Sequence, residues 1–300
     1  MSREMWIEQT KKKIRFMTNS IWNGITMTDV DRFLSNFDQD DITGLSLLDM
    51  LIYYSSEQES NLIESLLLKL KHDLWIKGFL GDIEATSEEL LKNMDLLSSR
   101  LCFVPVNDEN DPASSCYSLS SFYKKSSSLH KSVQFCEPRD IPLMMALKKN
   151  IFVFYDDIVG TGNQFREFWS KTKHFGDFDT TIDNISRLND NICFYYLALG
   201  GCIDSINKLS QEYPNLTILV AESFPENCSV LDETNEYWEL NPQNMKEVTE
   251  FINNKKSEFS INSRFHKDLP VLFQHGRAPN TSLFLYWYGH EDNWKELYRR

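Results

Sequence analysis

The sequence lacks long apolar runs. No stretch approaches the roughly 20 consecutive apolar residues that a helix needs to cross a bilayer. The first residues, Met1 to Trp6, include charged side chains and lack the apolar core of a secretory signal peptide. We therefore expect a cytoplasmic protein that has no membrane partner.

Basic residues are also scarce. Lys and Arg number 31 against 44 Asp and Glu, which gives a formal net charge of −13. Nonspecific nucleic-acid binding draws on positive charge. The composition therefore argues against a general DNA- or RNA-binding protein, although it does not exclude a local contact.

Cysteine pairs with metal-ligand spacing are missing. The six cysteines form no Cys-x-x-Cys pair. This spacing does not suggest a zinc site, and it does not suggest a disulfide framework. We interpret the cysteines as reduced thiols of a cytosolic protein.

The apolar residues that are present change their spacing near residue 97. Residues 1–97 show helical periodicity and predict a helical N-terminal region. From residue 98 to residue 300, short apolar runs alternate with helical patterns. The predicted strands are 101–106, 151–155, 192–199 and 216–221, and the predicted helices include 203–213 and 242–255. This alternation predicts an α/β domain with a doubly wound, mostly parallel sheet whose strands are covered on both faces.

Residues 151–165, Ile-Phe-Val-Phe-Tyr-Asp-Asp-Ile-Val-Gly-Thr-Gly-Asn-Gln-Phe, are the most informative segment. The apolar residues predict a buried strand that ends at Asp156 and Asp157, and a Gly-rich turn leads into a predicted helix. Ligands of open parallel sheets bind outside the carboxyl ends of the strands. A Gly-rich turn before a helix presents N–H groups to an anion. One loop therefore offers carboxylates for sugar hydroxyls or a metal beside a cradle for phosphate.

Two other interpretations of this segment remain open. Many Gly-containing turns after strands only close a tight connection between a strand and a helix. Paired acids also bind Mg²⁺ in response-regulator receivers, although there they lie near the N-terminus and no Gly-Thr-Gly follows at once.

The order of features in this segment resembles the type I phosphoribosyltransferase family, whose signature is a hydrophobic strand, two acidic residues and a short Gly/Thr-rich phosphate loop. The resemblance implies the type I fold, with the N-terminal region as a helical extension. It implies that Asp156 and Asp157 are catalytic and hold the ribose hydroxyls of phosphoribosyl pyrophosphate or a related nucleotide. The implied 5-phosphate loop is Gly160, Thr161, Gly162, Asn163 and Gln164. The cofactor would be Mg²⁺, which would bridge the pyrophosphate and involve the two aspartates only indirectly.

The loop departs from the family pattern, which is closer to Thr-Gly-Gly-Thr. It still keeps small residues where the backbone must approach an oxyanion. In the family, a second loop one strand earlier grips the pyrophosphate. The corresponding stretch here is polar and Ser-rich, and its candidates are Ser118, Ser120, Ser121, Lys124 and Lys125. The alternative is a solvated surface loop. Near the C-terminus, Asn280 and Tyr286 are candidates for contact with a base.

Both ends of the chain look like those of phosphoribosyltransferase-like proteins from bacterial conflict systems, some of them retron-associated. The similar stretches are 33–54 and 275–300, and they accompany an Asp-Asp-x-x-Gly-x-Gly-x-Gln motif that is complete at 156–164. This resemblance implies an effector, or an effector subunit, of antiphage defence. The helical N-terminal region would then dock a partner, such as a reverse transcriptase or its nucleic acid in a retron complex. The alternative for this region is an elaborated lid or a larger core.

Three classes of function fit these features. The chain could be a phosphoribosyltransferase, a nucleotide-sensing module on the same fold that catalyses nothing, or an interaction protein with a vestigial pocket. The intact motif favours the first two. It does not separate them, because binding and turnover use the same residues.

Overall fold

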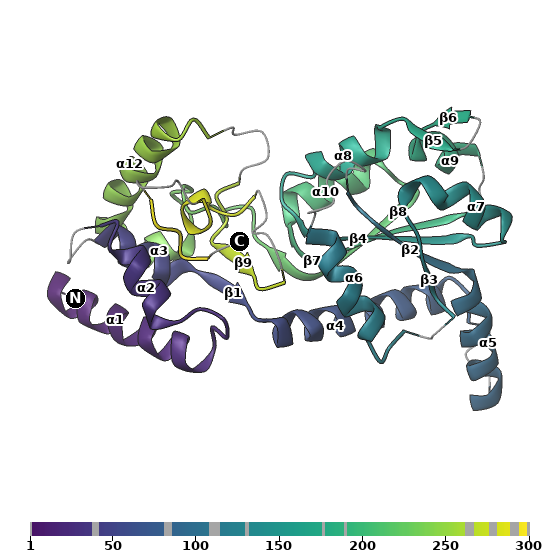
Figure 1. Cartoon of the computed structure of the whole chain (residues 1–300), viewed down its shortest axis with the longest axis horizontal. Coiled ribbons are helices and arrows are strands. Elements are labelled where there is room, and N and C mark those ends of the chain that lie inside the picture. The colour runs from purple at the N-terminus through teal and green to yellow at the C-terminus, as the bar shows by residue number, and fades with distance from the viewer. Residues whose placement is uncertain are drawn as a thin grey trace. The chain divides into compact units, whose positions relative to one another are not determined.

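The computed structural model describes residues 2–37, 42–80, 86–107, 115–129, 132–175, 178–188, 191–261, 267–275, 281–288 and 294–298 (Figure 1). The chain divides into two compact units. Unit 1 comprises Met1–Glu59 and Pro225–Arg300, and unit 2 comprises Ser60–Phe224. These boundaries differ from the predicted division at residues 97 and 98, because the first helices pack with the C-terminal part of the chain.

Unit 1 combines segments from both ends of the sequence. Its helices are α1 (Arg3–Ser20), α2 (Met27–Leu34), α3 (Ile42–Met50), α11 (Glu236–Leu240), α12 (Pro242–Glu258) and the 3₁₀ helix η2 (Phe284–Tyr286), and its strands are β1 (Ile52–Tyr54) and β9 (Val271–Phe273). The two strands pair in parallel, with Tyr53 opposite Leu272. A shared apolar core that includes Trp6, Phe33 and Trp294 joins the N- and C-terminal segments into one unit.

Unit 2 contains the predicted α/β sheet. The helix α4 (Ser56–Ile76) crosses the boundary into it. The further elements are α5 (Ser87–Arg100), β2 (Leu101–Pro105), α6 (Ser115–Lys125), β3 (Gln134–Phe135), η1 (Pro138–Asp140), α7 (Ile141–Ala146), β4 (Ile151–Val159), α8 (Asn163–Ser170), β5 (Lys173–Phe175), β6 (Phe178–Thr180), α9 (Ile182–Leu188), β7 (Cys193–Cys202), α10 (Ile203–Glu212) and β8 (Leu216–Phe224). The main sheet has the order β3-β2-β4-β7-β8, and every neighbouring pair in it is parallel. The predicted α/β fold class is thereby confirmed.

Helices cover both faces of this sheet, with α8 and α10 on one side and α4 and α6 on the other (Figure 1). The strand β4 is buried along its whole length. On one face Phe154 packs against Phe168 and Trp169 of α8, with ring centroids 5.4 and 5.7 Å apart. On the other face Tyr155 packs against Tyr123 of α6 at 5.1 Å. Burial on both faces explains why these strands are continuous apolar runs rather than alternating ones.

Local signals explain where several helices begin. The hydroxyl of Thr26 accepts from the Asp29 N–H, and the Asp29 carboxylate accepts from the Thr26 N–H, which forms a capping box at the start of α2. Thr86 and Glu89 repeat this arrangement at α5. Pro242 occupies the first turn of α12, where its missing N–H costs nothing.

Two elements differ from the sequence-based expectation. The strand predicted to stop before the aspartates continues to Val159. The polar stretch interpreted as a pyrophosphate loop contains the helix α6. Within the described ranges, no helix is both long and apolar enough to cross a membrane.

Candidate functional site

At the level of the aspartate pair, β4 has lost its neighbour β2 but still pairs with its other neighbour, β7. Pairing between β2 and β4 ends with Pro105 opposite Tyr155. Pairing between β4 and β7 runs on to Val159 opposite Gly201. Because all of these strands are parallel, the pair lies toward the carboxyl edge of the sheet, where open α/β sheets bind ligands.

The Asp156 carboxylate lies in a polar network, although it is only 1% exposed. Its Oδ1 accepts from the Asp157 N–H at 2.9 Å and from the Cys116 thiol at 3.3 Å. Its Oδ2 accepts from the Gln164 amide and the Tyr196 hydroxyl, both at 3.2 Å. Donors therefore surround both oxygens, and the group is buried by polar contacts rather than by apolar packing alone.

The surroundings of Asp156 act on its pKa in opposite directions. Burial raises the pKa of Asp156 well above its ordinary value, and the charge of Asp157 raises it further. Hydrogen bonds from the Asp157 N–H, Cys116 and Tyr196 lower it, but the net direction is upward. Burial followed by the nearby Asp156 charge also raises the pKa of Tyr196. Asp156 therefore retains a proton to a higher pH than an exposed aspartate does.

Asp157 has different surroundings. Successive side chains of a strand point to opposite faces, so Asp157 shares the face of Tyr155 while Asp156 shares the face of Phe154. Asp157 is 5% exposed. Strand alternation therefore starts the two side chains on opposite faces, but at this edge, where β2 has ended, Asp156 is also reached by Cys116 of α6.

The predicted phosphate loop connects β4 directly to the start of α8. Gly162 is the N-cap of α8, with φ 77°, a left-handed conformation in which glycine is favoured. The Thr161 hydroxyl accepts from the Asn163 N–H at 3.2 Å. Gly162 has no side chain with which to cap the helix, so the first turn of α8 presents N–H groups and the positive end of the helix dipole at this loop.

Arg166 braces the loop from within α8. Its Nη1 donates to the Thr161 carbonyl at 3.1 Å and to the Asn163 side-chain oxygen at 3.0 Å. The same guanidinium makes two hydrogen bonds to Glu212 of α10, at 2.6 and 3.0 Å. This two-pronged pair fixes the guanidinium orientation, and the orientation in turn holds the loop.

Gln164 links the loop to the aspartates. Its amide donates to the Val106 carbonyl at 3.3 Å as well as to Asp156. Gln164 is an exposed residue on the solvent side of a buried carboxylate. The strand tip, the loop and the residue that follows β2 therefore form one hydrogen-bonded unit.

The residues predicted to grip pyrophosphate do not form a loop at this site. Ser118, Ser120, Ser121, Lys124 and Lys125 all lie on α6. The Lys124 ammonium lies 5.0 Å from the centre of the Phe135 ring. A helix rises about 1.5 Å per residue, so Lys124 lies about 12 Å along α6 from Cys116, which contacts Asp156. These residues lie in a helix instead of the predicted loop, because an amphipathic pattern around Leu119 and Tyr123 folds this stretch against the sheet; their contact with pyrophosphate stays a prediction.

The two candidate base contacts have different outcomes. Asn280 lies outside the described residues. Tyr286 is fully buried in the core of unit 1, and its hydroxyl donates to the Leu47 carbonyl at 2.7 Å. This placement assigns the Tyr286 ring to core packing and does not support a base contact.

Three residues of the site were not anticipated from the sequence: Cys116, Arg166 and Tyr196. Tyr196 could have been predicted from the sequence, because alternate residues of a strand point to one face of the sheet and Tyr196 lies on the strand next to Asp156. Arg166 lies three residues after Asn163, a spacing at which side chains on one helix meet. Cys116 carried no signal, since its approach to Asp156 depends on where α6 docks.

The side chains around the aspartate pair test whether the protein alone could hold the expected Mg²⁺. Among the residues that the structure describes, no group of three His, Cys, Asp or Glu side chains is placed to hold a metal ion. Both oxygens of Asp156 already accept hydrogen bonds. A site held by protein ligands alone therefore does not fit. A Mg²⁺ carried by a diphosphate fits better, because such ions need only one or two carboxylates and keep several waters.

Comparison with known proteins adds a family assignment. The family model PRTase-CE matches residues 30–300, which include the aspartate pair, the Gly-rich loop and all of unit 2. No curated protein matches the sequence. The chain therefore belongs to the PRTase-CE family and is a phosphoribosyltransferase-like protein.

Proposed function

We propose that the chain binds phosphoribosyl pyrophosphate, or a related nucleotide, at the carboxyl edge of the unit 2 sheet. The hydrogen bond between Gln164 and Asp156, 3.2 Å long, is the observation that carries the proposal. Because of this contact the acidic strand tip adjoins the Gly-rich loop, so a carboxylate and a phosphate cradle lie side by side. A phosphorylated pentose needs both at a fixed separation.

The loop would hold the 5-phosphate. The N–H groups of the first turn of α8 and the left-handed turn at Gly162 suit an oxyanion. Arg166 is committed to Glu212 and to the loop, so it would act by holding the backbone rather than by contacting the phosphate. Binding energy gained here would position the ribose carbon that reacts.

The two aspartates would have separate roles. Asp156 anchors the Asp157 N–H and the Gln164 amide. A ribose hydroxyl would reach Asp156 by replacing the Gln164 amide, which lies on the solvent side. Asp157 would supply negative charge to the ring as it becomes oxocarbenium-like. Mg²⁺ arriving with the ligand would neutralise the departing pyrophosphate.

A second candidate function is nucleotide sensing without turnover. It is favoured by the donors that already occupy both oxygens of Asp156 and by the raised pKa of this carboxyl. A carboxyl whose two oxygens already accept hydrogen bonds, and which keeps its proton to a higher pH, stabilises a cationic ring poorly. Ligand binding would then act by releasing Gln164 from Asp156.

Calorimetric titration with phosphoribosyl pyrophosphate and Mg²⁺ tests the site. Asp157→Asn alone should weaken binding by about tenfold or more. The double change of Asp156 and Asp157 to asparagine should abolish binding while the circular dichroism spectrum stays native. Glu247→Gln on an exposed part of α12 is the matched control and should bind like the wild type. Equal affinity of the double variant and the control would remove the ribose assignment.

A second assay measures the release of pyrophosphate from phosphoribosyl pyrophosphate in the presence of nucleobases or nucleic acids. It separates the transferase from the nucleotide sensor. Release that depends on Asp157 would establish a transferase. Tight binding without release would favour the sensor.

The resemblance of the chain ends suggests a setting for this activity. We propose that the protein acts in the cytoplasm as an effector, or an effector subunit, of antiphage defence. Its partner would be a protein such as a retron reverse transcriptase, or the nucleic acid of that enzyme. Expression in a bacterial host followed by phage challenge tests this. Protection that the double aspartate variant loses would support the role, and equal plating with and without the protein would contradict it.

A further inference from the structure

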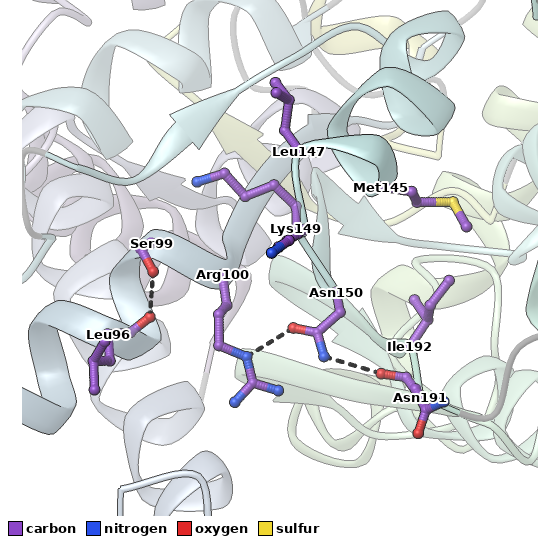
Figure 2. A pocket seen from close by; sticks show the side chains of 10 residues that line it. Leu96, Ser99, Arg100, Met145, Leu147, Lys149, Asn150, Asn191 and Ile192 are labelled. Atoms are coloured by element: carbon purple, nitrogen blue, oxygen red, sulfur yellow. Dashed lines mark hydrogen bonds between the residues drawn. The ribbon is translucent and has the colours of Figure 1, made fainter.

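Unit 2 has a second candidate site at the opposite edge of its sheet. A pocket of about 760 Å³ lies beside Arg100, Asn150 and Ile192 (Figure 2). These residues directly precede the parallel strands β2, β4 and β7, so the pocket lies at the amino edge. Six residues of strand at about 3.3 Å each separate Asn150 from Asp156, which is about 20 Å. The pocket is therefore distinct from the aspartate and Gly-loop site.

The lining of this pocket is cationic in an otherwise acidic chain. Arg100, Lys148 and Lys149 line it, and none of its described lining residues carries a carboxylate. The whole chain has a net charge of −13. Three cations are therefore gathered at one pocket of a chain whose net charge is negative.

Arg100 is held in place by the neighbouring loops. Its Nε donates to the Asn150 side-chain oxygen at 2.8 Å, and the Asn150 amide donates to the Asn191 carbonyl at 3.1 Å. Figure 2 shows this chain of hydrogen bonds along the pocket. The guanidinium also lies 5.0 Å from the centre of the Phe79 ring. Within the described ranges its terminal nitrogens make no further hydrogen bond, and the residue lines the pocket.

Lys149 is the most unusual member of the cluster. It is only 6% exposed, and its ammonium has no hydrogen-bond or ion-pair partner among the residues that the structure describes. Burial lowers the pKa of Lys149. The Lys149 Nζ is not among the buried polar atoms that lack a partner, so the ammonium stays accessible at the pocket although most of the side chain is covered. An anion in the pocket would favour its charged form.

Lys148 occupies the position just after a helix end at which glycine is the usual residue. Its N–H donates to the Met145 carbonyl at 2.9 Å, and the following N–H donates to the Met144 carbonyl at 2.9 Å. This is the Schellman pattern at the end of α7, and it places Lys148 at φ 64°. α4 ends in the same pattern with Gly78 at φ 78°. A lysine in this conformation is strained, and strain of this kind gathers at binding sites.

We propose that this pocket binds the phosphates of a nucleoside diphosphate or triphosphate. Arg100, Lys148 and Lys149 would contact the phosphates, and Met145 and Ile192 would form an apolar wall for the base. The volume lies within the range of small-ligand sites, about 300–1,000 Å³. A concave site with three cations suits a small anion better than a nucleic-acid backbone, which needs an extended basic surface.

Calorimetric titration of the full chain with ADP tests the proposal. Lys149→Met should weaken ADP binding roughly tenfold or more. Lys246→Met, which removes an 86% exposed side-chain charge on α12, is the matched control and should leave the affinity unchanged. Pyrophosphate should compete with ADP, and adenosine alone should bind far more weakly. The double aspartate variant should keep this binding, so failure of the phosphoribosyl site and failure of the amino-edge pocket are distinguishable.

Lys148→Gly separates a binding role from a structural one. Glycine relieves the left-handed backbone, so its melting temperature should rise. Its ADP affinity should nevertheless fall several-fold. Absence of ADP binding to the wild type at millimolar concentration would overturn the proposal. So would equal affinity of Lys149→Met and Lys246→Met, or binding of single-stranded DNA but not ADP through these lysines.

Discussion

Gly162 and Gly78 form a matched pair within unit 2. Both adopt left-handed conformations, with φ 77° and 78°. A Cβ added at Gly162 would lie 3.1 Å from two carbons of Leu209 and 3.3 Å from Arg166 Nη1, whereas a Cβ at Gly78 would meet no atom within 4 Å. Substitution by alanine therefore imposes the same backbone strain at both positions but crowding only at the loop.

The expected costs follow from these distances. Alanine in the left-handed region costs about 1–2 kcal/mol, and the stiffer unfolded chain offsets about 0.4–1 kcal/mol of this. Gly78→Ala should therefore destabilise unit 2 by about 1 kcal/mol. Overpacking against Leu209 adds about 1–3 kcal/mol, so Gly162→Ala should cost about 2–4 kcal/mol. It should also weaken phosphoribosyl pyrophosphate binding, since the added methyl group displaces the phosphate loop.

Urea titration read by hydrogen–deuterium exchange on unit 2 peptides measures these costs without mixing in the unfolding of unit 1. Calorimetry under native conditions measures the affinity. Equal destabilisation by the two substitutions would refute the crowding at Leu209. An unchanged affinity for phosphoribosyl pyrophosphate in Gly162→Ala, with Gly78→Ala as the reference, would refute the phosphate-loop assignment.

Two further predictions concern buried polar groups. The pKa of Asp156 in the folded protein is raised. The contribution of Asp156 to stability is therefore full below its unfolded pKa of about 4 and is lost as the pH rises to the folded pKa. The free energy of unfolding falls over this range by at most about 1.4 kcal/mol per pH unit. Asp156→Asn should lack this loss, and parallel stability–pH curves for variant and wild type would contradict the prediction. Tyr286→Phe should destabilise unit 1 by about 1–3 kcal/mol in urea unfolding, because the buried Leu47 carbonyl loses its donor. Its phosphoribosyl pyrophosphate affinity should stay unchanged, and a clear loss of affinity would restore Tyr286 as a base contact.

Short-range patterns were sufficient for the element that carries the candidate site. The apolar run from Ile151, the two aspartates and the glycines at 160 and 162 predicted a strand, a turn and a helix in that order, and the structure contains β4, the loop and α8. Each signal acts over a few residues, so it can be interpreted without knowledge of the rest of the fold. The strand end was predicted too early, because apolar character falls at Asp156 while pairing with β7 continues to Val159.

Contacts between distant segments could not be derived in this way. Tyr286 was predicted to meet a base, but its hydroxyl bonds Leu47, which lies 239 positions away. The Ser-rich stretch was expected to be a loop, yet burial of Leu119 and Tyr123 against the sheet makes it a helix. Pairing of β1 with β9 likewise places the N-terminal helices in a unit with the C-terminal segment.

The sequence by itself therefore determined the α/β class, the motif and the residue types of the candidate site, because these depend on periodicity and local turn chemistry. Only the tertiary structure decided the surroundings of Asp156, the brace from Arg166 to Glu212 and the cationic pocket at the amino edge. The physical reason is that hydrogen bonds and burial at these places join segments that lie far apart in the chain. Their pairing depends on how whole elements pack together, and no local pattern encodes that packing.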